Sequence, residues 1–223
     1  MTGLIVVALA VIASWLSIHY FHRYQKEDIS SPKTSARLNR LWEYVNKAFQ
    51  SRRWRASERA LLAILRIDHK NTAAYNRLGM LYAKQSNFDD AIDCFSIASS
   101  LTPTLATLYN LGLVQYEKGN FKEAANALER VIDLEPNVKR YIAYAKALHK
   151  LESDKKVAEV LEKVVELEPT AVHYDMLAQV YENIKQHKKA EEARRLATSL
   201  RTRRLLGRRR GSKSARLATR RIG

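Results

Sequence analysis

The side chains best placed to do chemistry in this sequence are the basic ones at its carboxyl-terminal end. Residues 201–223 hold ten Lys and Arg residues and no Asp or Glu. Guanidinium and ammonium groups at this density attract anions, either the headgroups of an acidic lipid leaflet or the phosphates of a nucleic acid. A solvated tail that binds neither is the alternative, and residues 207–223 contain no aromatic side chain to stack on bases. The candidate anion-binding residues are Arg203, Arg204, Arg208, Arg209, Arg210, Lys213, Arg216, Arg220 and Arg221.

Patterns typical of catalysis are missing from the rest of the sequence. It has no Gly-rich phosphate loop, no His-Glu-x-x-His and no Gly-x-Ser-x-Gly, and its six histidines are scattered. A single cysteine, Cys94, forms no disulfide within the chain and no Cys-x-x-Cys metal site. Because free cysteine inside a helix usually packs as a small apolar residue, we predict a packing role for Cys94. We therefore expect a protein without catalytic activity, metal or cofactor.

A regular sequence period, of about 33 residues, organises the middle of the chain. Gly79 and Gly112 are one such period apart, and Pro103, Pro136 and Pro169 follow one another at the same interval. Periods of 20 to 50 residues are the signature of stacked structural repeats. The chain is therefore predicted to build its central region from repeated supersecondary units.

One unit can be read in detail between residues 105 and 136. Leu108 and Leu111 share one face of a first helix, and Ala124 and Leu128 share one face of a second. A Gly-Asn pair at residues 119–120 predicts the turn between them. The proline that ends each unit disfavours helix in the residue before it. Each repeat is therefore expected to be a helix-turn-helix.

These residues resemble the tetratricopeptide repeat, in which Leu-Gly, Tyr, Ala, an aromatic residue, Ala and Pro recur over about 34 residues. The copy from residue 72 matches this pattern with Tyr75, Leu78, Gly79, Tyr82, Phe88, Ala91, Phe95, Ala98 and Pro103. The copy from residue 105 matches it with Leu108, Leu111, Gly112, Phe121, Ala124 and Pro136. The resemblance covers roughly residues 38–200 and implies an all-α solenoid of about five repeats. The expected repeats are residues 38–71, 72–104, 105–137, 138–170 and 171–203, within a repeat domain of residues 38–200.

The resemblance also implies a binding surface. Tetratricopeptide proteins build a concave groove from the non-packing face of each first helix, and they use it to bind protein partners. A mixture of aromatic, amide and charged groups suits an extended peptide or a helix laid into a groove. By position, the resemblance assigns the groove to Trp42, Asn46, Asn76, Arg77, Met80, Tyr109, Asn110, Leu113, Tyr116, Lys146, Gln179 and Glu182.

An apolar segment precedes the repeats. Residues 3–21 carry no charged residue over 19 positions. At about 1.5 Å per residue, such a helix nearly spans a hydrocarbon core of about 30 Å. A cleaved signal peptide is the alternative, but no basic residue comes before the apolar run. We expect a transmembrane anchor over residues 1–24 that contacts the membrane through residues 3–21.

The charges beside this segment predict an orientation. Nothing basic precedes it, whereas Arg23, Lys26 and Lys33 follow it. The positive-inside rule then puts the amino terminus outside and the repeats in the cytoplasm, with the inverted topology as the alternative. Residues 25–37 have no periodicity and contain Ser-Ser-Pro, which is typical of a linker. Residues 201–223 are too polar to form a core and are expected to be disordered.

The charge distribution separates the repeats from their flanks. The net charge of the chain is +16, yet residues 61–200 hold 19 basic and 19 acidic residues. The sequence therefore predicts a single-pass membrane protein that presents a groove to a cytoplasmic protein or peptide. The alternative is an adaptor for RNA, the ribosome or anionic lipid that acts through its basic tail.

Overall fold

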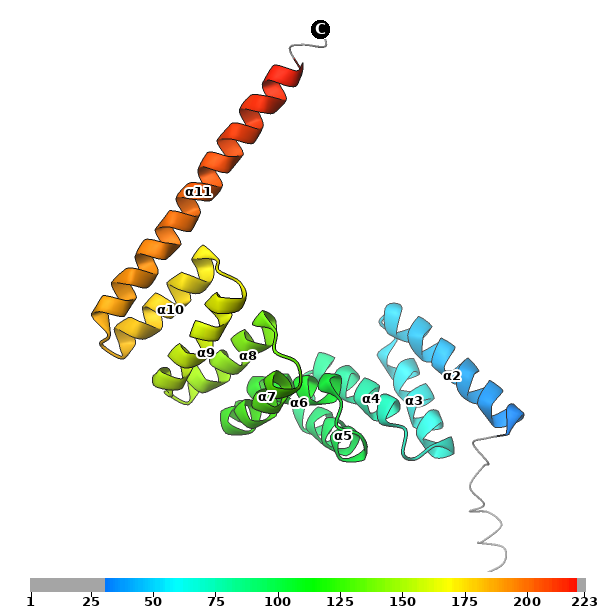
Figure 1. The fold of residues 1–223 in the computed structure, drawn as a ribbon. Helices are drawn as coiled ribbons and strands as arrows, with labels where there is room; N and C mark the ends of the chain where they lie inside the picture. Colours follow the sequence, from blue (N-terminus) through cyan, green and yellow to red (C-terminus); the bar gives the residue numbers. More distant parts are fainter. Residues whose placement is uncertain (1–30, 220–223) are drawn as a thin grey trace, which may run out of the picture. The chain divides into compact units, whose positions relative to one another are not determined.

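The computed structural model describes residues 31–219, with side chains described as far as Arg203. These residues form α-helices and no β-strand (Figure 1). The ten helices are α2 (Pro32–Gln50), α3 (Trp54–Ile67), α4 (Thr72–Lys84), α5 (Phe88–Leu101), α6 (Leu105–Lys118), α7 (Phe121–Leu134), α8 (Val138–Lys150), α9 (Asp154–Leu167), α10 (Ala171–Asn183) and α11 (His187–Thr219). The expected pair of short helices joined at Gly119-Asn120 is confirmed, because α6 ends just before this turn and α7 begins just after it.

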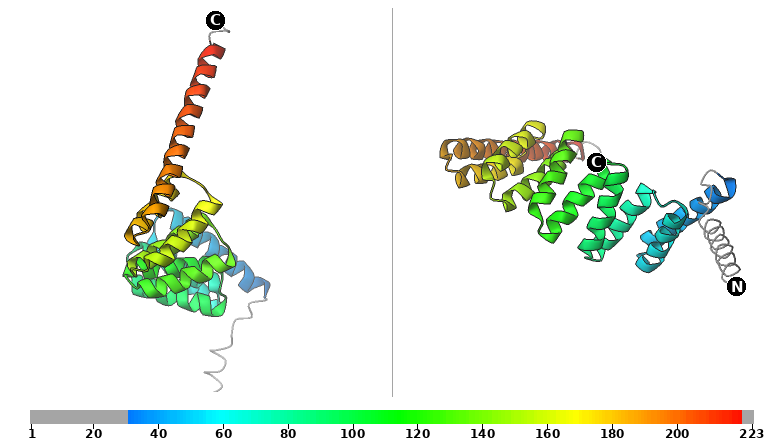
Figure 2. Two further views of the ribbon diagram at one scale, coloured as in Figure 1. Left: turned by 60° about the vertical axis from the view of Figure 1, so that its left-hand side comes forward. Right: turned by 90° about the horizontal axis from the view of Figure 1, so that it is seen from below.

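Contacts divide the chain into two compact units, Met1–Leu78 (unit 1) and Gly79–Gly223 (unit 2), with the boundary inside α4. In unit 1, α2 packs against α3. In unit 2, each helix from α5 to α10 packs against the next one along the chain, and α6 also contacts α8 (Figure 2). Consecutive helix pairs that stack in this way form an α-solenoid.

The core of unit 2 repeats with the sequence period. In α7, Ala124, Leu128 and Val131 are almost completely buried. Val157, Leu161 and Val164 occupy the same places in α9, one period later, and are equally buried. Spacings of four and three residues put each set on one face of its helix. Burying one of these Leu or Val side chains stabilises the fold by about 1.5–3 kcal/mol.

In the four repeats after the first, the first helix is capped at the same repeat position. Asn71, Thr104, Asn137 and Thr170 each lie one period after the one before. The side-chain oxygen of each accepts a hydrogen bond from a backbone N–H in the first turn, over 2.9–3.2 Å. Such a cap satisfies a donor that the helix itself leaves free. The loop that follows each proline is therefore also the start signal of the next repeat.

The turn inside each repeat is periodic as well. The residues with positive φ are Arg52, Ser86, Gly119, Glu152 and Lys185, with φ between 54° and 93°. They recur at the repeat interval to within a single position, and each lies between the first and second helix of its pair. The left-handed conformation costs residues other than glycine roughly 1–2 kcal/mol. Four of the five turns therefore store backbone strain.

Glycine is required where paired helices approach closely. A Cβ atom placed on Gly79 in α4 would lie 2.7 Å from Cε1 of Phe95 in α5. Phe95 is only 1% exposed and is held by its neighbours. The Leu-Gly pair of the repeat thus marks the site where an aromatic side chain of the second helix crosses the backbone of the first.

The membrane span predicted from the sequence requires correction. Residues 3–21 lie outside the described residues, and within residues 31–219 no helix is both long and apolar enough to cross a membrane. The described helices are amphipathic, and the longest of them, α11, is rich in Lys and Arg. For residues 31–219 the fold class is therefore corrected to an all-α solenoid in which no described helix crosses a membrane, and the predicted single-pass localisation is corrected with it, since no described helix supports it.

The two ends of the repeat region also differ from the sequence interpretation. Residues 25–37 were expected to be a linker, but α2 begins at Pro32 because the Ser31 side chain caps its first turn. Residues 201–223 were expected to be disordered, but α11 continues to Thr219. Arg, Lys, Leu and Ala dominate this stretch of the sequence, and all four residue types favour helix.

Candidate functional site

Three neighbouring cavities lie on the first helices of unit 2. The largest, of about 510 Å³, lies between α6 and α8 and is lined by Tyr109, Tyr116 and Ile142. A second, of about 200 Å³, shares Leu113 and Glu117 with it and extends to Met80. A third, of about 410 Å³, shares Lys146 with the largest and extends to α10. Because adjacent cavities share lining residues, they form one continuous row, which we call the groove.

Seven of the twelve residues predicted for the binding surface line the groove. They come from the end of α4 and from α6, α8 and α10, and each lies on the first helix of its repeat. The seven are Met80, Tyr109, Asn110, Leu113, Tyr116, Lys146 and Gln179. The repeat register thus brings together side chains that are up to three periods apart in the sequence.

Four of the other predicted residues, Trp42, Asn46, Asn76 and Arg77, belong to unit 1 and line none of the described cavities of unit 2. The guanidinium of Arg77 lies 5.6 Å from the centre of the Phe49 ring, in a cation–π contact within unit 1. Such a contact holds the Arg77 side chain against the fold.

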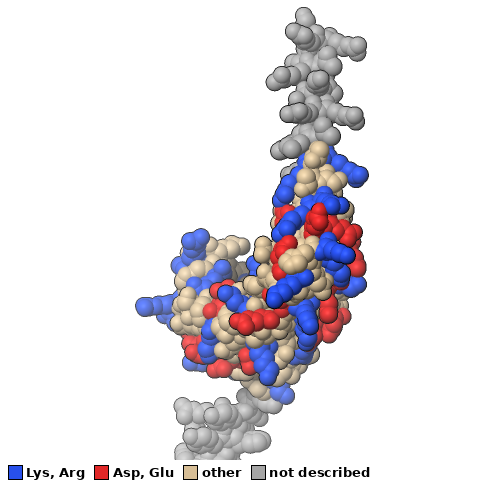
Figure 3. All heavy atoms as spheres, turned by 90° about the vertical axis from the view of Figure 1, so that its left-hand side faces the viewer, with Lys and Arg blue, Asp and Glu red and all other residues tan. Residues whose placement is uncertain are grey.

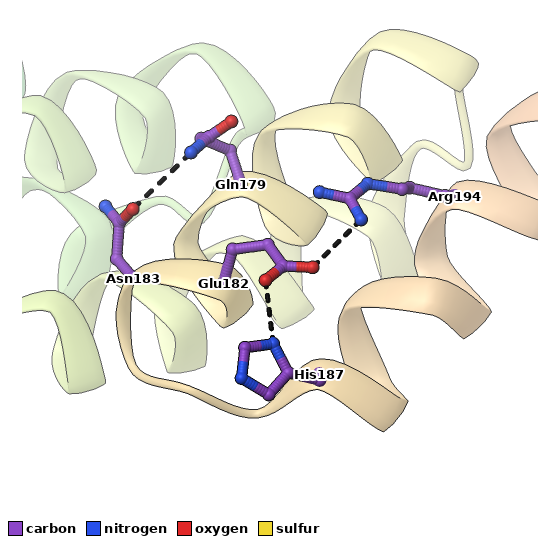
Figure 4. Close-up of polar contacts among 5 residues, drawn as sticks. All are labelled: Gln179, Glu182, Asn183, His187 and Arg194. Atoms are coloured by element: carbon purple, nitrogen blue, oxygen red, sulfur yellow. Dashed lines mark hydrogen bonds and ion pairs between the residues drawn. The ribbon is translucent and has the colours of Figure 1, made fainter.

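Glu182, the remaining predicted residue, is directed at α11 (Figure 4). Its carboxylate lies 2.8 Å from Nδ1 of His187 and accepts a hydrogen bond of 2.9 Å from Nη1 of Arg194. The hydrogen bond with His187, followed by the charge of Arg194, lowers the pKa of Glu182 below its usual value. Glu182 therefore ties α10 to α11, while Gln179, one turn earlier, lines the groove.

Several lining residues were missed by the sequence interpretation, although the period could have found them. Ile142 and His149 lie one period after Tyr109 and Tyr116, and Met176 lies two periods after Asn110. The full set of missed residues on α8 and α10 is Val138, Lys139, Ile142, Ala143, Ala145, His149, Asp175, Met176, Val180 and Asn183. Applying the same register to every repeat would have selected five of these ten, namely Ile142, Ala143, His149, Asp175 and Met176.

The groove has an apolar floor and a charged rim. Leu113 is 37% exposed on this floor, and the partly buried Ile142 and Met176 continue the apolar surface. The exposed Lys139 and Lys146 project from α8, opposite Glu117 on α6. Asp175 at the far end pairs with Arg201 of α11. The groove therefore offers apolar contacts along its length and both signs of charge at its edges.

The surroundings of the groove carry mixed charge. Basic and acidic side chains intermingle around the base of α11 in Figure 3. Residues 79–203 contain 18 basic and 18 acidic residues. Among the described residues, no group of three or more His, Cys, Asp and Glu side chains could hold a metal ion.

Comparison with known proteins identifies the repeats. Models of the tetratricopeptide repeat match residues 70–135, 109–172 and 174–203, which together make up more than half of the chain. The chain belongs to the tetratricopeptide repeat family. A search of curated proteins found no significant match. The resemblance drawn from the Leu-Gly and Pro spacing is thereby confirmed.

Solved structures support the same fold for this tetratricopeptide repeat protein. A crystal structure of MamA protein superimposes with a TM-score of 0.69 at 19% identity, over 75% of this chain and 93% of that chain. MamA residues 41-end from Desulfovibrio magneticus RS-1 superimpose with a TM-score of 0.65 at 20% identity, over 74% of this chain and 95% of that chain. At this level of identity the likeness concerns the fold alone.

The basic tail predicted to bind anions falls largely outside the described side chains. Arg203 is exposed near the middle of α11, and the other predicted tail residues come after it. The tail prediction therefore continues to rest on charge composition.

Proposed function

We propose that this protein is a scaffold whose groove binds a short segment of a protein partner. The observation that carries the proposal is the row of cavities across α6, α8 and α10, which share Leu113, Glu117 and Lys146. Tetratricopeptide repeat proteins bind protein partners, and a groove of this length suits a peptide better than a compact metabolite. The role is one of binding, in line with the sequence-based expectation that the chain is not an enzyme.

The composition of the groove indicates what the bound segment should contain. Tyr109, Tyr116 and Ile142 line the groove cavity of about 510 Å³, which has room for a large apolar or aromatic side chain. Lys146 separates this cavity from the one on α10 and carries a charge that no described ion pair neutralises. A segment with an apolar anchor followed by an acidic residue complements both features.

Selection of peptides from a random library displayed on phage, with the full-length chain as bait, would test the proposal. The groove variant Leu113→Gln/Lys146→Glu changes two exposed side chains of the groove and leaves the core intact. We expect selected peptides to share an apolar anchor and to bind this variant at least tenfold more weakly, because a central apolar contact and a charge contact are lost.

A matched control is available on α7. Leu134 is 60% exposed, Lys122 is exposed, and neither lines a described cavity. The variant Leu134→Gln/Lys122→Glu makes the same two chemical changes away from the groove and should bind the selected peptides like the wild type. Equal loss in both variants, or no loss in the groove variant, would contradict the proposal.

A further inference from the structure

The described part of unit 1 carries a large excess of positive charge. Residues 31–78 contain eleven Lys and Arg residues against three Asp and Glu residues. Residues 79–203 of unit 2, in contrast, are neutral. Even if every acidic group in this part of unit 1 offsets one basic group, eight positive charges remain there. A compact unit with this charge attracts polyanions.

Much of this charge lies along one face of α2. Lys33, Arg37, Arg40, Tyr44 and Lys47 are all exposed and follow one another at spacings of four and three residues. This spacing puts them on a single face of the helix, with one side chain for each turn of about 5.4 Å. The buried residues Thr34, Val45 and Ala48 lie on another face, toward the core. We call the five exposed residues the α2 stripe.

A second set of basic residues lies along α3. Arg55, Arg59 and Arg66 are exposed and fall on one face of that helix, together with Leu62, which is 42% exposed. Lys70 extends the set into the loop before α4. The excess charge therefore covers both helices of the first repeat and is not confined to one loop.

Unit 1 has few acidic groups to neutralise this surface. Asp68 is engaged in its own loop, where its carboxylate accepts hydrogen bonds from the Lys70 backbone N–H and the Asn71 side chain over 3.2 and 2.8 Å. Glu43 and Glu58 are the other two acidic residues of the described part of unit 1. In unit 2 the ion pairs join residues such as Lys163 and Glu166, at 3.0 Å. Three acidic groups cannot offset eleven basic ones, so the described part of unit 1 keeps a net positive charge.

An aromatic ring interrupts the basic residues of the α2 stripe. Tyr44 is 45% exposed, which is a large fraction for an aromatic side chain. The guanidinium of Arg53 lies 5.9 Å from the centre of its ring. Nucleic-acid bases stack on exposed aromatic rings and on guanidinium planes whatever their identity, while the phosphates contact neighbouring basic side chains. Stacking between bases and aromatic rings has no counterpart in a purely electrostatic contact with a lipid surface.

From this arrangement we propose that the α2 stripe binds single-stranded nucleic acid, with phosphates at Lys33, Arg40 and Lys47 and a base stacked on Tyr44. From Lys33 to Lys47 the stripe extends over about 21 Å of helix, which is long enough for several nucleotides of an extended strand. Binding should show little preference for base sequence. This site is separate from the groove of unit 2 and does not depend on the function proposed for it.

Fluorescence anisotropy with the full-length chain and a labelled oligouridylate of about 20 nucleotides would test this proposal. The stripe variant Lys33→Gln/Arg40→Gln/Lys47→Gln changes three exposed side chains on one face of α2. We expect its affinity to fall at least tenfold. The slope of log K against log salt should become shallower by about 2, because each phosphate contact on a single strand contributes about 0.7.

The control must remove the same charge elsewhere. Lys122→Gln/Lys155→Gln/Lys188→Gln changes three exposed lysines of unit 2 and lowers the net charge equally. It should alter the affinity less than twofold if binding is local to unit 1. An equal loss in both triple variants would show a diffuse charge effect, and an unchanged affinity in the stripe variant would locate binding elsewhere, for example in the tail. Either result would overturn the proposal.

Substitutions of Tyr44 distinguish binding of nucleic acid from binding of other anions. Tyr44→Ala should weaken oligouridylate binding about tenfold, while Tyr44→Phe, which keeps the ring, should bind like the wild type. Circular dichroism melting curves would confirm that both variants fold. Vesicles containing phosphatidylserine provide the remaining comparison. If the stripe variant loses vesicle binding while its affinity for oligouridylate is unchanged, the α2 stripe recognises a lipid surface and the proposal is wrong.

Discussion

Gly112 in α6 and Leu128 in α7 meet where the two helices of one repeat approach closely. A Cβ atom placed on Gly112 would lie 2.7 Å from Cγ of Leu128. Leu128 is 1% exposed and belongs to the core cluster of unit 2, and it also borders the groove cavity of about 510 Å³. The Leu-Gly pair of the repeat is therefore a packing requirement between two helices.

Gly112→Ala should destabilise the protein, although replacing glycine by alanine in a helix normally adds about 1 kcal/mol of stability. Overpacking a rigid core typically costs about 1–3 kcal/mol and should outweigh this gain. We expect the free energy of unfolding in urea to fall by about 1 kcal/mol. Leu128→Ala should be tested alone and in combination, because the smaller side chain makes room for the new methyl group. A double variant less stable than the sum of the single changes would contradict the steric explanation.

At a turn residue with left-handed backbone conformation, we predict that a substitution raises the free energy of unfolding, in contrast to Gly112→Ala. Lys185 is exposed and has a φ of 60°, at the position where Gly119 stands with a φ of 93° in an earlier repeat. Lys185→Gly should therefore stabilise the protein by about 0.5 kcal/mol, since the relief of strain exceeds the greater chain entropy of glycine. Thermal and urea unfolding would measure the change.

Two further substitutions control for this effect. Gly119→Ala should destabilise the protein through strain alone, because an added Cβ would meet no other atom within 4 Å. Lys146→Gly, at an exposed position within α8, should cost about 1 kcal/mol. If Lys185→Gly lowers stability as Lys146→Gly does, the left-handed conformation is not the source of strain in this turn.

The period made most of the helix-pair architecture predictable from the sequence. Pro103 and Pro136 mark the ends of second helices, and Gly119 marks a turn, because each of these residues restricts its own backbone locally. The start of α2 was harder to predict, since it depends on Ser31 and Thr34 and no proline period extends so far toward the amino terminus. The continuation of α11 to Thr219 could not be predicted from periodicity, because the sequence after residue 203 has no regular spacing of apolar residues.

The groove was predictable only in part, because its composition depends on contacts between repeats. Tyr116 and Glu182 occupy the same repeat position, two periods apart, yet only Tyr116 lines a cavity. His187 and Arg194 hold Glu182 against α11, and no feature of the period predicts that contact. The repeat position of a residue therefore predicts the helix face from which its side chain projects. Contacts with neighbouring side chains determine whether that side chain lines the groove or packs against another helix.

Cys94 should react slowly with alkylating reagents. Burial, followed by the nearby charges of Asp90 and Asp93, raises the pKa of the Cys94 thiol to about 11. Only the thiolate is nucleophilic, so at pH 8 the rate with iodoacetamide should be about two orders of magnitude below that of the urea-unfolded chain. Asp90→Asn/Asp93→Asn should accelerate alkylation only slightly, because burial is the larger cause. Equal rates in the folded and unfolded chains would show that Cys94 is accessible and reactive.

The contact of Glu182 with His187 and Arg194 should make the docking of α11 dependent on pH. The pKa of Glu182 is lowered in the folded protein, so the carboxylate binds protons less readily there than in the unfolded chain. Its contribution to stability is therefore complete above the ordinary glutamate pKa and is lost as the pH falls through the lowered value. A carbon-detected NMR titration of Glu182 should show a lower midpoint in the folded protein than in the urea-unfolded chain.

Two variants separate the partners of this carboxylate. His187→Ala removes the larger cause of the shift and should raise the pKa of Glu182 toward its ordinary value, whereas Lys188→Ala, one residue along the same helix, should leave it unchanged. In Glu182→Gln, the free energy of unfolding should fall less steeply with acid than in the wild type, because one carboxylate with a lowered pKa is gone. An identical acid dependence in both proteins would mean that Glu182 contributes nothing to holding α11 against α10, and that the packing of Ala190, Ala193 and Ala197 does so alone.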